Sequence, residues 1–301
     1  MKSTKPPLTF IQQAKLLASR GLVADRGDLE IFLSNVNYYR FSGYLYPFRS
    51  KVGDNYLPGT TLEQIRNIYN FDSELRLLTL SAIEIIEIAL LRTRMVECFS
   101  ITHGAFCYTD INCFGSRLSK FDHIEMLDNI ERNVDRSTEE FVSLYRAKYT
   151  SEPHLPFWMV AETCTFGQLS KIFYYLPHKV KVTLAMQFDL HYRDLGSWLH
   201  ALSVARNICA HHARLWNRRL PVKPSIPSIK YHPEFYSPVK VSNDSYFVIL
   251  AMLEYLVKTI YPDKSIKNDF EKLFVKYPGV PINKMGFPKN WHECAVFVKQ
   301  K

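Results

Sequence analysis

The chain lacks the residue patterns that mark several common classes of protein. Its six cysteines form no C-x-x-C pair and have no zinc-ligand spacing, so we expect reduced thiols and no metal site. It also lacks the GxxxxGKS/T loop that cradles nucleotide phosphates and the GxSxG turn that carries a nucleophilic serine. We therefore expect neither of these enzyme classes, and no cofactor.

Long uninterrupted apolar runs are missing as well. The longest apolar stretches are broken by charge, as at Glu84 and Glu87 or at Glu254 and Lys258, so none predicts a membrane span. The first residues, Met1–Pro7, are not followed by the apolar core of a signal peptide. We expect a soluble, cytoplasmic protein that does not associate with a membrane.

What the chain does contain is mostly apolar and basic. Hydrophobic residues make up 47% and aromatic residues 14% of 301 residues, which is enough to form a substantial core. The formal net charge of +9 suits a polyanionic partner, because Lys and Arg that neutralise phosphates release counterions. The alternative is that the excess charge only keeps the protein in solution, so charge alone does not decide between the two.

Helical patterns dominate the chain. Sequences of the capping-box type start at Thr9, Thr60 and Ser137, each with Gln or Glu three residues later. From Thr60 to His103 there is neither glycine nor proline, so one or two long helices must fill this region. We expect an all-α fold.

A proline-rich segment follows Arg219. Prolines recur between residues 221 and 238 and exclude a long helix, because each one removes a backbone donor and fixes φ. We expect an extended loop near the functional site, then a helix that is capped by Asn243 or Ser245 and runs to Ile260, and a last short helix over residues 266–276.

The stretch from Arg206 to His212 combines an arginine, an amide and two imidazoles, groups that handle RNA phosphodiesters without a metal. Apolar residues spaced by three and four positions from Leu195 to Cys209 predict a helix with one buried stripe. Asn207 and His211 are one turn apart on another face of that helix. The sequence therefore predicts a functional site at the end of this helix.

The chemistry of these side chains favours RNA cleavage. His211 would act as general base on a ribose 2′-hydroxyl or as general acid on the leaving 5′-oxygen, since an imidazole titrates near neutral pH. Arg206 would hold the phosphate and stabilise the charge that builds on it, and Asn207 would orient the backbone or the imidazole. Because the 2′-hydroxyl is the nucleophile, such a centre cuts RNA and spares DNA.

Two further residues are candidates for catalytic support. His212 is a spare general acid, a phosphate contact or a packed neighbour, and these roles stay open. Glu84 would orient Arg206 or His211 of its own or a partner subunit, or it forms an ion pair on a helix face. We do not expect Cys209 and the two histidines to bind zinc, because the three residues do not share one helix face.

Two other segments have the same spacing of arginine and histidine. They run from Arg117 to His123 and from Arg193 to His200. The first has Leu118 where a polar residue should follow the arginine, and the second passes through Gly196 at an expected helix start. We interpret both as coincidental.

Basic and aromatic residues in two places are candidates for RNA contacts. In the tail of the motif, arginines could hold RNA phosphates and an aromatic ring could stack on a base. The alternative is that the tail is only a solvated basic helix end. An aromatic segment near the amino terminus can hold RNA in the same way or simply pack in the core. The candidates are Arg214, Trp216, Arg218 and Arg219 in the tail, and Tyr39 and Arg40 in the aromatic segment.

The motif and its tail resemble the signature of the Abi-like (AbiD/AbiF type) abortive-infection family, a branch of the HEPN ribonuclease superfamily. Its residues are Arg206-Asn207-x-Cys-Ala-His211-His212-x-Arg214-Leu-Trp216-Asn217. Other blocks resemble the family in the same order along almost the whole chain. They are Asn37–Tyr44, Phe71–Arg76, Ile83–Glu84, Pro156–Trp158, Phe166–Ser170 and Met285–Trp291.

The resemblance implies an all-α, HEPN-type helical bundle with additional N-terminal and C-terminal helices. We expect an N-terminal extension over residues 1–58, a HEPN core over 59–220, and a Pro-rich loop with C-terminal helices packed on it over 221–301. The resemblance also implies a homodimer that brings two motifs together, RNA cleavage in phage defence or a toxin–antitoxin system, and a bound small non-coding RNA or an antitoxin.

Two classes of function stay open. The first is a metal-independent endoribonuclease with Arg206, Asn207 and His211 as catalytic residues. The second is an RNA-binding or phage-sensing HEPN module that binds RNA without cutting it. The intact motif favours the first, because a pure binder has no need of an imidazole placed over an amide.

Overall fold

The computed structural model describes residues 6–298, and the regular secondary structure of this part of the chain is entirely helical. Its only extended pairings are two isolated bridges, Val23 with Thr61 and Arg49 with Tyr56. The expected all-α fold is confirmed. Residues Met1–Lys5, on which the expectation about a signal peptide partly rests, lie outside the described residues.

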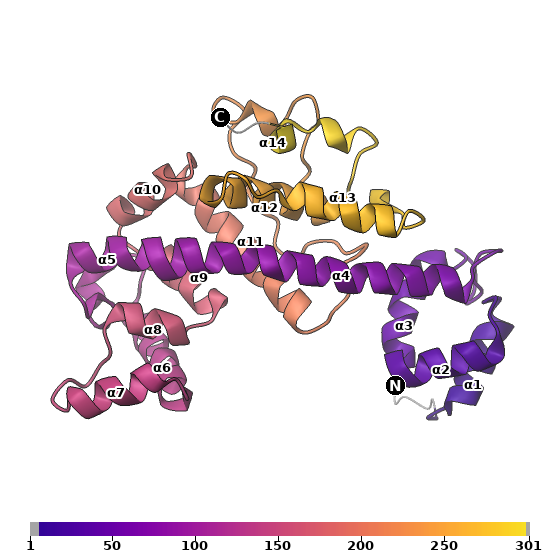
Figure 1. Cartoon of the computed structure of the whole chain (residues 1–301), viewed down its shortest axis with the longest axis horizontal. Coiled ribbons are helices and arrows are strands. Elements are labelled where there is room, and N and C mark those ends of the chain that lie inside the picture. Colours follow the sequence, from indigo (N-terminus) through magenta and orange to yellow (C-terminus); the bar gives the residue numbers. More distant parts are fainter. Residues whose placement is uncertain (1–5, 299–301) are drawn as a thin grey trace.

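One long helical rod crosses the middle of the molecule (Figure 1). It consists of α4 (Leu62–Ile86), a π-helical segment η2 (Glu87–Met95) and α5 (Val96–His103), which follow one another without a break. The absence of glycine and proline from this region predicts such a rod, and the prediction is confirmed.

The start of the rod differs from the expected cap by one residue. The side chain of Thr61, not Thr60, accepts a hydrogen bond from the Gln64 backbone N–H at 3.1 Å. Thr60 is buried and its hydroxyl donates to the Leu57 carbonyl at 2.7 Å. The threonine nearer the helix has the extended φ and ψ that an N-cap needs, so the expected Thr60–Glu63 box is wrong.

Smaller helices cover the two ends of the rod (Figure 1). At the α4 end lie α1 (Phe10–Ser19), α2 (Arg26–Val36), α3 (Tyr38–Leu45) and the short 3₁₀ turn η1 (Tyr46–Phe48). At the α5 end lie α6 (Lys120–Arg136), α7 (Glu140–Lys148) and α8 (Phe157–Thr163).

Two of the predicted caps in these end helices have different outcomes. The expected capping box at Thr9 is present, with both reciprocal hydrogen bonds to Gln12. The one at Ser137 is wrong, because Glu139 takes the N-cap position of α7 without a side-chain hydrogen bond.

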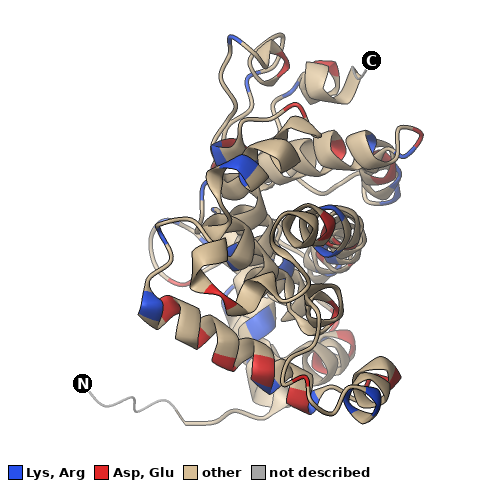
Figure 2. Cartoon of the chain, turned by 90° about the vertical axis from the view of Figure 1, so that its left-hand side faces the viewer, with Lys and Arg blue, Asp and Glu red and all other residues tan. Residues whose placement is uncertain are grey.

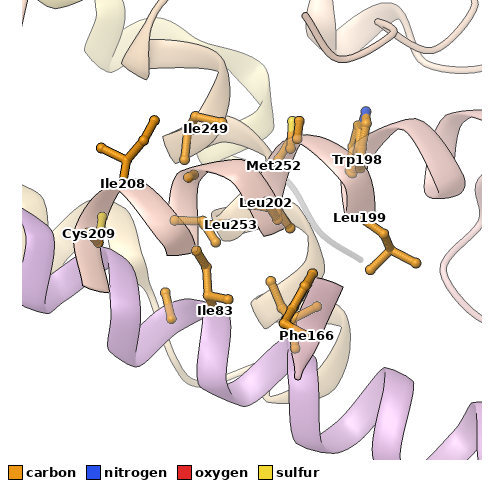
Figure 3. Close-up of a cluster of buried hydrophobic side chains, with 14 of the residues drawn as sticks. Ile83, Phe166, Trp198, Leu199, Leu202, Ile208, Cys209, Ile249, Met252 and Leu253 are labelled. Atoms are coloured by element: carbon orange, nitrogen blue, oxygen red, sulfur yellow. The ribbon is translucent and has the colours of Figure 1, made fainter. Parts of the chain in front are cut away.

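The remaining helices build the core against the rod. They are α9 (Phe166–Tyr175), α10 (His178–Met186), α11 (Tyr192–Ala210), α12 (Tyr246–Ile260), α13 (Ile266–Lys276) and α14 (Ala295–Val298). In the cluster of Figure 3, Leu199 and Leu202 of α11 lie among Ile83 of α4 and Ile249 and Met252 of α12. Each such side chain stabilises the fold by about 1.5–3 kcal/mol when fully buried. This packing holds α11, which carries the motif, between α4 and α12.

The proline-rich segment forms an irregular loop with one 3₁₀ turn, η5 (Pro233–Phe235). The Trp198 indole N–H donates to the Ser225 carbonyl at 2.9 Å, and the Ser225 N–H donates to the Ser197 hydroxyl at 2.9 Å. The loop therefore packs on the first half of α11, whereas the motif lies at its end. The expected absence of a long helix is confirmed, and the contacts of Ser225 place this part of the loop on the first half of α11 and not on the motif.

Charged residues are scattered over the fold. On the side of the molecule drawn in Figure 2, both basic and acidic positions occur along the helices, without a large surface of one sign. All six cysteines have free thiols. None of the helices described by the structure is both long and apolar enough to cross a membrane.

Candidate functional site

The motif occupies the last turn of α11 and the sharp turn after it. The helix ends at Ala210, His211 is its C-cap, and His212 has a φ of 54°. The His212 N–H donates to the Cys209 carbonyl at 3.0 Å, and the Ala213 N–H donates to the Ile208 carbonyl at 2.9 Å. This is a Schellman motif with a histidine in the left-handed position that glycine usually takes, a conformation that costs about 1–2 kcal/mol for other residues.

The three predicted catalytic residues lie together at this helix end. Asn207 and His211 are exposed one turn apart, and the His211 backbone N–H donates to the Asn207 carbonyl at 3.0 Å. Arg206 is half-buried beside them. Within residues 6–298, no side-chain hydrogen bond or ion pair joins these three residues. The side chains therefore share an open surface, and the expected contact of Asn207 with the imidazole is not formed within one chain.

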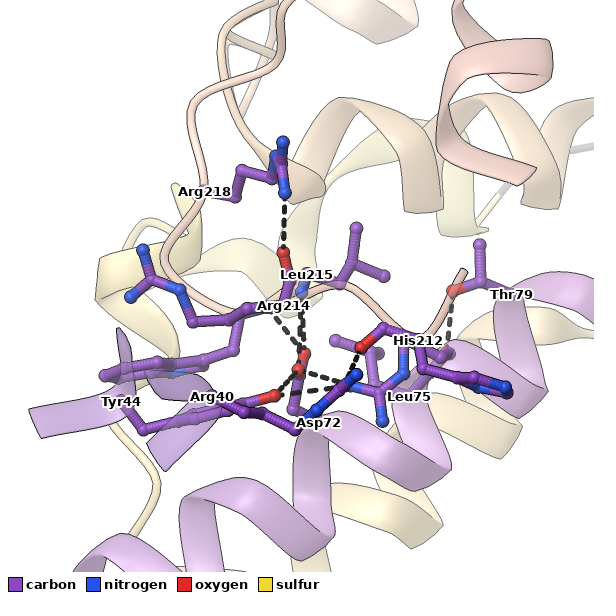
Figure 4. A network of polar contacts seen from close by, with 11 residues as sticks. Arg40, Tyr44, Asp72, Leu75, Thr79, His212, Arg214, Leu215 and Arg218 are labelled. Atoms are coloured by element: carbon purple, nitrogen blue, oxygen red, sulfur yellow. Dashed lines mark hydrogen bonds and ion pairs between the residues drawn. The ribbon is translucent and has the colours of Figure 1, made fainter. Parts of the chain in front are cut away.

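A buried carboxylate fixes the chain that follows the motif (Figure 4). Asp72 of α4 is fully buried and accepts hydrogen bonds from the backbone N–H groups of Leu215 at 3.1 Å and of Trp216 at 2.6 Å. It also accepts from the Tyr44 hydroxyl at 2.5 Å and forms an ion pair with Arg76 at 2.6 Å. One side chain of α4 thus joins α3, α4 and the tail of the motif.

The protonation of this network follows from its burial. Burial raises the pKa of the Asp72 carboxyl, against the opposing effect of the Arg76 charge and the three other donors. Burial and the neighbouring Asp72 raise the pKa of the Tyr44 phenol. Tyr44 therefore keeps its proton and remains a hydrogen-bond donor to Asp72.

Sequence reasoning did not single out Asp72. The available signal was an acidic residue at a core position of a predicted amphipathic helix, next to Phe71 and Leu75 and one turn before Arg76. A charge in a buried stripe needs partners, so this position indicates a buried polar network.

The aromatic segment near the amino terminus contributes to the site through Arg40. The Arg40 guanidinium donates to the His212 carbonyl, across 172 positions of sequence (Figure 4). Tyr39, its neighbour on α3, is 85% exposed. Phe41 and Tyr44 of the same helix are buried, so core packing accounts for these two residues. The structure thus places Arg40 beside the motif and leaves Tyr39 free on the surface.

Trp216 is not available to RNA. Its side chain is fully buried, and its ring stacks on Phe48 with centroids 6.5 Å apart and an interplanar angle of 12°. The prediction that Trp216 offers a stacking plane for a base is wrong, because Asp72 holds the Trp216 backbone inside the fold.

The three arginines of the tail have different surroundings. Arg214 is half-buried, burial lowers its pKa, and one terminal nitrogen has no hydrogen-bond partner among the described residues. Arg218 donates to the Arg214 carbonyl at 3.3 Å. Arg219 is exposed and paired with Asp244. All three arginines follow the end of α11 within nine residues, and the charge of Arg219 is already paired with Asp244.

Glu84 does not support the motif within one chain. It is exposed on α4, and its carboxylate has no ion pair or hydrogen bond with any residue in the described range 6–298. Neither interpretation from the sequence, orientation of Arg206 or His211 of the same chain or an ion pair on the helix face, is seen. Glu162 of α8, another carboxylate on the fold, forms an ion pair with Arg92 at 3.7 Å.

The surroundings of the motif do not resemble a metal centre. Among residues 6–298, no three His, Cys, Asp or Glu side chains are grouped so that they could hold an ion. Cys209 is buried, and burial raises the pKa of its thiol to about 12. Its thiol is therefore protonated at neutral pH.

The arrangement offers an open surface with a proton-transfer group and a fixed positive charge. An imidazole at His211 can accept or donate a proton, and the guanidinium of Arg206 can neutralise a phosphate that lies between them. Because Asp72 and the Schellman turn fix the backbone on both sides of His212, the surface is held in a defined geometry.

One comparison with known proteins covers most of the blocks of residues named above. The sequence model of the family described as Abi-like protein matches residues 31–217, from within α2 to Asn217 in the motif's tail, and does not reach Met285–Trp291. No curated protein and no solved structure matches the chain. Since the matched segment covers more than half of the chain and includes both Asp72 and Arg206–His212, the chain belongs to the Abi-like protein family.

Proposed function

We propose that the chain is a metal-independent endoribonuclease of a phage-defence (abortive infection) or toxin–antitoxin system. Membership of the Abi-like family indicates a role in abortive infection. The observation that carries the enzymatic part is the exposed pair Asn207 and His211, one turn apart beside Arg206, on a backbone held by buried Asp72. A structural histidine has no need of this exposure or of this support.

The reaction follows from these groups. His211 removes the proton of a ribose 2′-hydroxyl while the oxygen attacks the adjacent phosphorus. The bond from phosphorus to the 5′-oxygen breaks, and a second acid returns a proton to that oxygen. Arg206 balances the charge that develops on the phosphate. The products are a 2′,3′-cyclic phosphate and a free 5′-hydroxyl, and DNA is spared because it lacks the nucleophile.

A homodimer supplies the second acid. One imidazole cannot remove one proton and donate another in the same step, and each chain carries one Arg206–His211 pair. A two-fold axis between the two helix ends would bring a second His211 to the same phosphodiester. In this arrangement Glu84, unpaired within one chain, orients the arginine or histidine of the partner subunit. His212 is the alternative acid within the chain.

Regulation by a bound small non-coding RNA, or by a protein antitoxin, fits the charge of the chain. The net charge of +9 favours a polyanion, the Arg40 guanidinium contacts the His212 carbonyl, and Arg218 and Arg219 follow in the motif's tail. An RNA held there would cover His211 until it is released.

The alternative function is an RNA-binding or phage-sensing module that does not cut. One observation favours it: within the described chain, no side-chain hydrogen bond joins Arg206, Asn207 and His211. A binder uses the same basic surface and needs no such contact.

Cleavage of total RNA in EDTA distinguishes the two functions. The wild type, an Arg206→Ala/His211→Ala variant and a matched Arg132→Ala/His154→Ala variant, altered at exposed positions outside the motif, are incubated with cellular RNA and the cut ends are mapped. We expect 2′,3′-cyclic phosphate ends from the wild type and the matched variant only. Absence of cleavage after any co-purified RNA has been removed, or equal cleavage by all three proteins, contradicts the proposal.

A further inference from the structure

A cavity of about 650 Å³ opens beside α11, next to α9 and α10, at a distance from the turn that carries the motif. Its size lies within the range of small-molecule sites, about 300–1,000 Å³. Its lining contains no carboxylate. The basic residues that line it are Arg117, Lys171, Lys181, Arg193 and His200.

The charge of Lys181 is not balanced by a carboxylate in this cavity. Its side chain is buried, with 9% of the residue exposed, and within the described residues it has no acidic partner. Its ammonium donates to the Tyr174 carbonyl at 3.0 Å and lies 5.9 Å from the centre of the Tyr192 ring. Burial and the nearby charge of Arg117 lower its pKa. A buried ammonium beside a like charge is costly unless an anion joins it.

The rest of the lining suits the other parts of a nucleotide. The guanidinium of Arg117 lies 5.5 Å from the Tyr174 ring centre, and that of Arg193 lies 5.7 Å from the Tyr192 ring centre. Aromatic rings of this kind stack on nucleobases. Three serine residues at positions 170, 197 and 203 offer hydroxyl groups to a sugar.

The cavity and the motif share one face of α11. Gly196, His200, Ser203, Asn207 and His211 follow one another at spacings of three and four residues, which places them along one side of the helix. With a rise of 1.5 Å per residue, the axial distance from His200 to Asn207 is about 10 Å. Ser203, between them, is buried against Gly167 of α9, so a strand that joins the cavity to the motif has to pass over this contact.

The cavity gives a role to residues that sequence reasoning dismissed. Arg193 and His200 belong to one of the two segments interpreted as coincidental, and Arg117 belongs to the other. His123, the fourth residue, is buried instead, and its ring bonds to the Tyr108 carbonyl at 2.9 Å. Three of the four residues thus meet in one place, although more than 70 positions separate Arg117 from Arg193.

We propose that this cavity binds a nucleotide, with the phosphate on Lys181, Arg117 and Arg193 and the base on the tyrosine rings. The nucleotide is either free or part of an RNA strand that continues along α11 to Asn207 and His211. Only the continuation of that strand to the motif rests on the proposed function, because binding of a nucleotide in the cavity requires no cleavage.

Binding is measured on the Arg206→Ala/His211→Ala background, so that a failure to cut does not affect the result. The probe is a short fluorescent RNA with a 5′-phosphate, followed by anisotropy, with 5′-AMP and inorganic phosphate as competitors. Arg117→Ala/Arg193→Ala removes two exposed arginines of the cavity, and Arg132→Ala/Arg136→Ala removes two exposed arginines of α6 as the matched control. Each removed arginine takes away a charged hydrogen bond to the phosphate, so we expect at least about a tenfold loss of affinity in the first variant and none in the control.

The competitors identify the source of the nucleotide. Displacement by 5′-AMP identifies a free nucleotide as a ligand, and displacement by unlabelled RNA alone identifies a strand. Lys181→Met, checked for folding by circular dichroism, should weaken binding of whichever ligand is found. Equal affinity in the cavity variants and the matched control overturns the proposal, even if the wild type cuts RNA.

Discussion

Two sets of polar groups meet at the turn of His212, and they differ in whether they have hydrogen-bond partners within the chain. Asp72 is fully buried, and each of its oxygens has donors around it, whereas Asn207 and His211 are exposed and have no side-chain partner within the described residues. Buried polar groups left without partners would destabilise the fold, so the first set is satisfied within the chain. The second set is left free for a ligand. The difference separates the residues that hold the site from those that do chemistry there.

The largest expected effect is the loss of cleavage in His211→Ala. General acid–base catalysis contributes about 10²–10⁴-fold to a rate, and we expect a decrease of that size. The side chain is exposed, so the melting temperature should change little. Initial rates on a fluorogenic RNA and a thermal melt check both parts. His154→Ala, another exposed histidine, is the control, and a variant that cuts at the wild-type rate rules out His211 as the base.

Asp72→Ala should lower the stability of the fold, because Asp72 belongs to the buried set of polar groups. It leaves Arg76 as an unpaired buried charge and removes the acceptor of the Leu215 and Trp216 N–H groups. Loss of one member of a buried ion pair destabilises by about 3–5 kcal/mol, which urea unfolding measures. Asp263→Ala, at an exposed position, should change the free energy of unfolding little. An Asp72 variant as stable as that control contradicts the supporting role.

Trp216→Ala tests the corrected position of the indole. A large buried aromatic residue replaced by alanine destabilises by about 3–5 kcal/mol because a cavity remains. Trp216→Phe keeps the stacking on Phe48 and should lose less. Urea unfolding ranks the two variants, and RNA affinity of the Phe variant should equal that of the wild type. If either variant lost RNA binding without losing stability, the result would contradict the buried position of the Trp216 indole.

The smallest expected effect concerns His212, which lies in the sequence between the exposed His211 and the tail that Asp72 holds. His212→Gly removes the strain of a left-handed residue, about 1–2 kcal/mol, against a loss from the greater freedom of the unfolded glycine, about 0.5–1 kcal/mol. We expect a net gain in the free energy of unfolding of at most about 1.5 kcal/mol. His212→Ala keeps the strain and is the comparison. Cleavage by both variants at the wild-type rate assigns the second acid to the partner's site, whereas a loss in both assigns it to His212.

Local patterns predicted much of the fold. The unbroken rod from Leu62 to His103 follows from the absence of glycine and proline, and α11 follows from its apolar stripe. The shared face of Asn207 and His211 follows from the helical period alone. The caps at Thr60 and Ser137 were misplaced, because neighbouring threonine or acidic residues compete for the same position and the sequence does not rank them.

The candidate site was predicted less completely. Its catalytic candidates are adjacent in sequence, so one motif contains them. Its support is not: Asp72 lies 143 positions before Leu215, and Arg40 lies 172 positions before His212. Trp216, with arginines on either side in the sequence, was predicted to contact RNA. Its side chain is buried in the core instead, where Asp72 accepts a hydrogen bond from its backbone N–H.

By itself, the sequence determined the helices, the end of α11 and the set of reactive groups there, because these depend on residues within a few turns of one another. The tertiary structure alone decided which charges are buried, which aromatic rings face solvent and which arginines meet at the cavity beside α11. These properties arise when helices distant in sequence pack together, and burial then sets the free energy of every polar group between them.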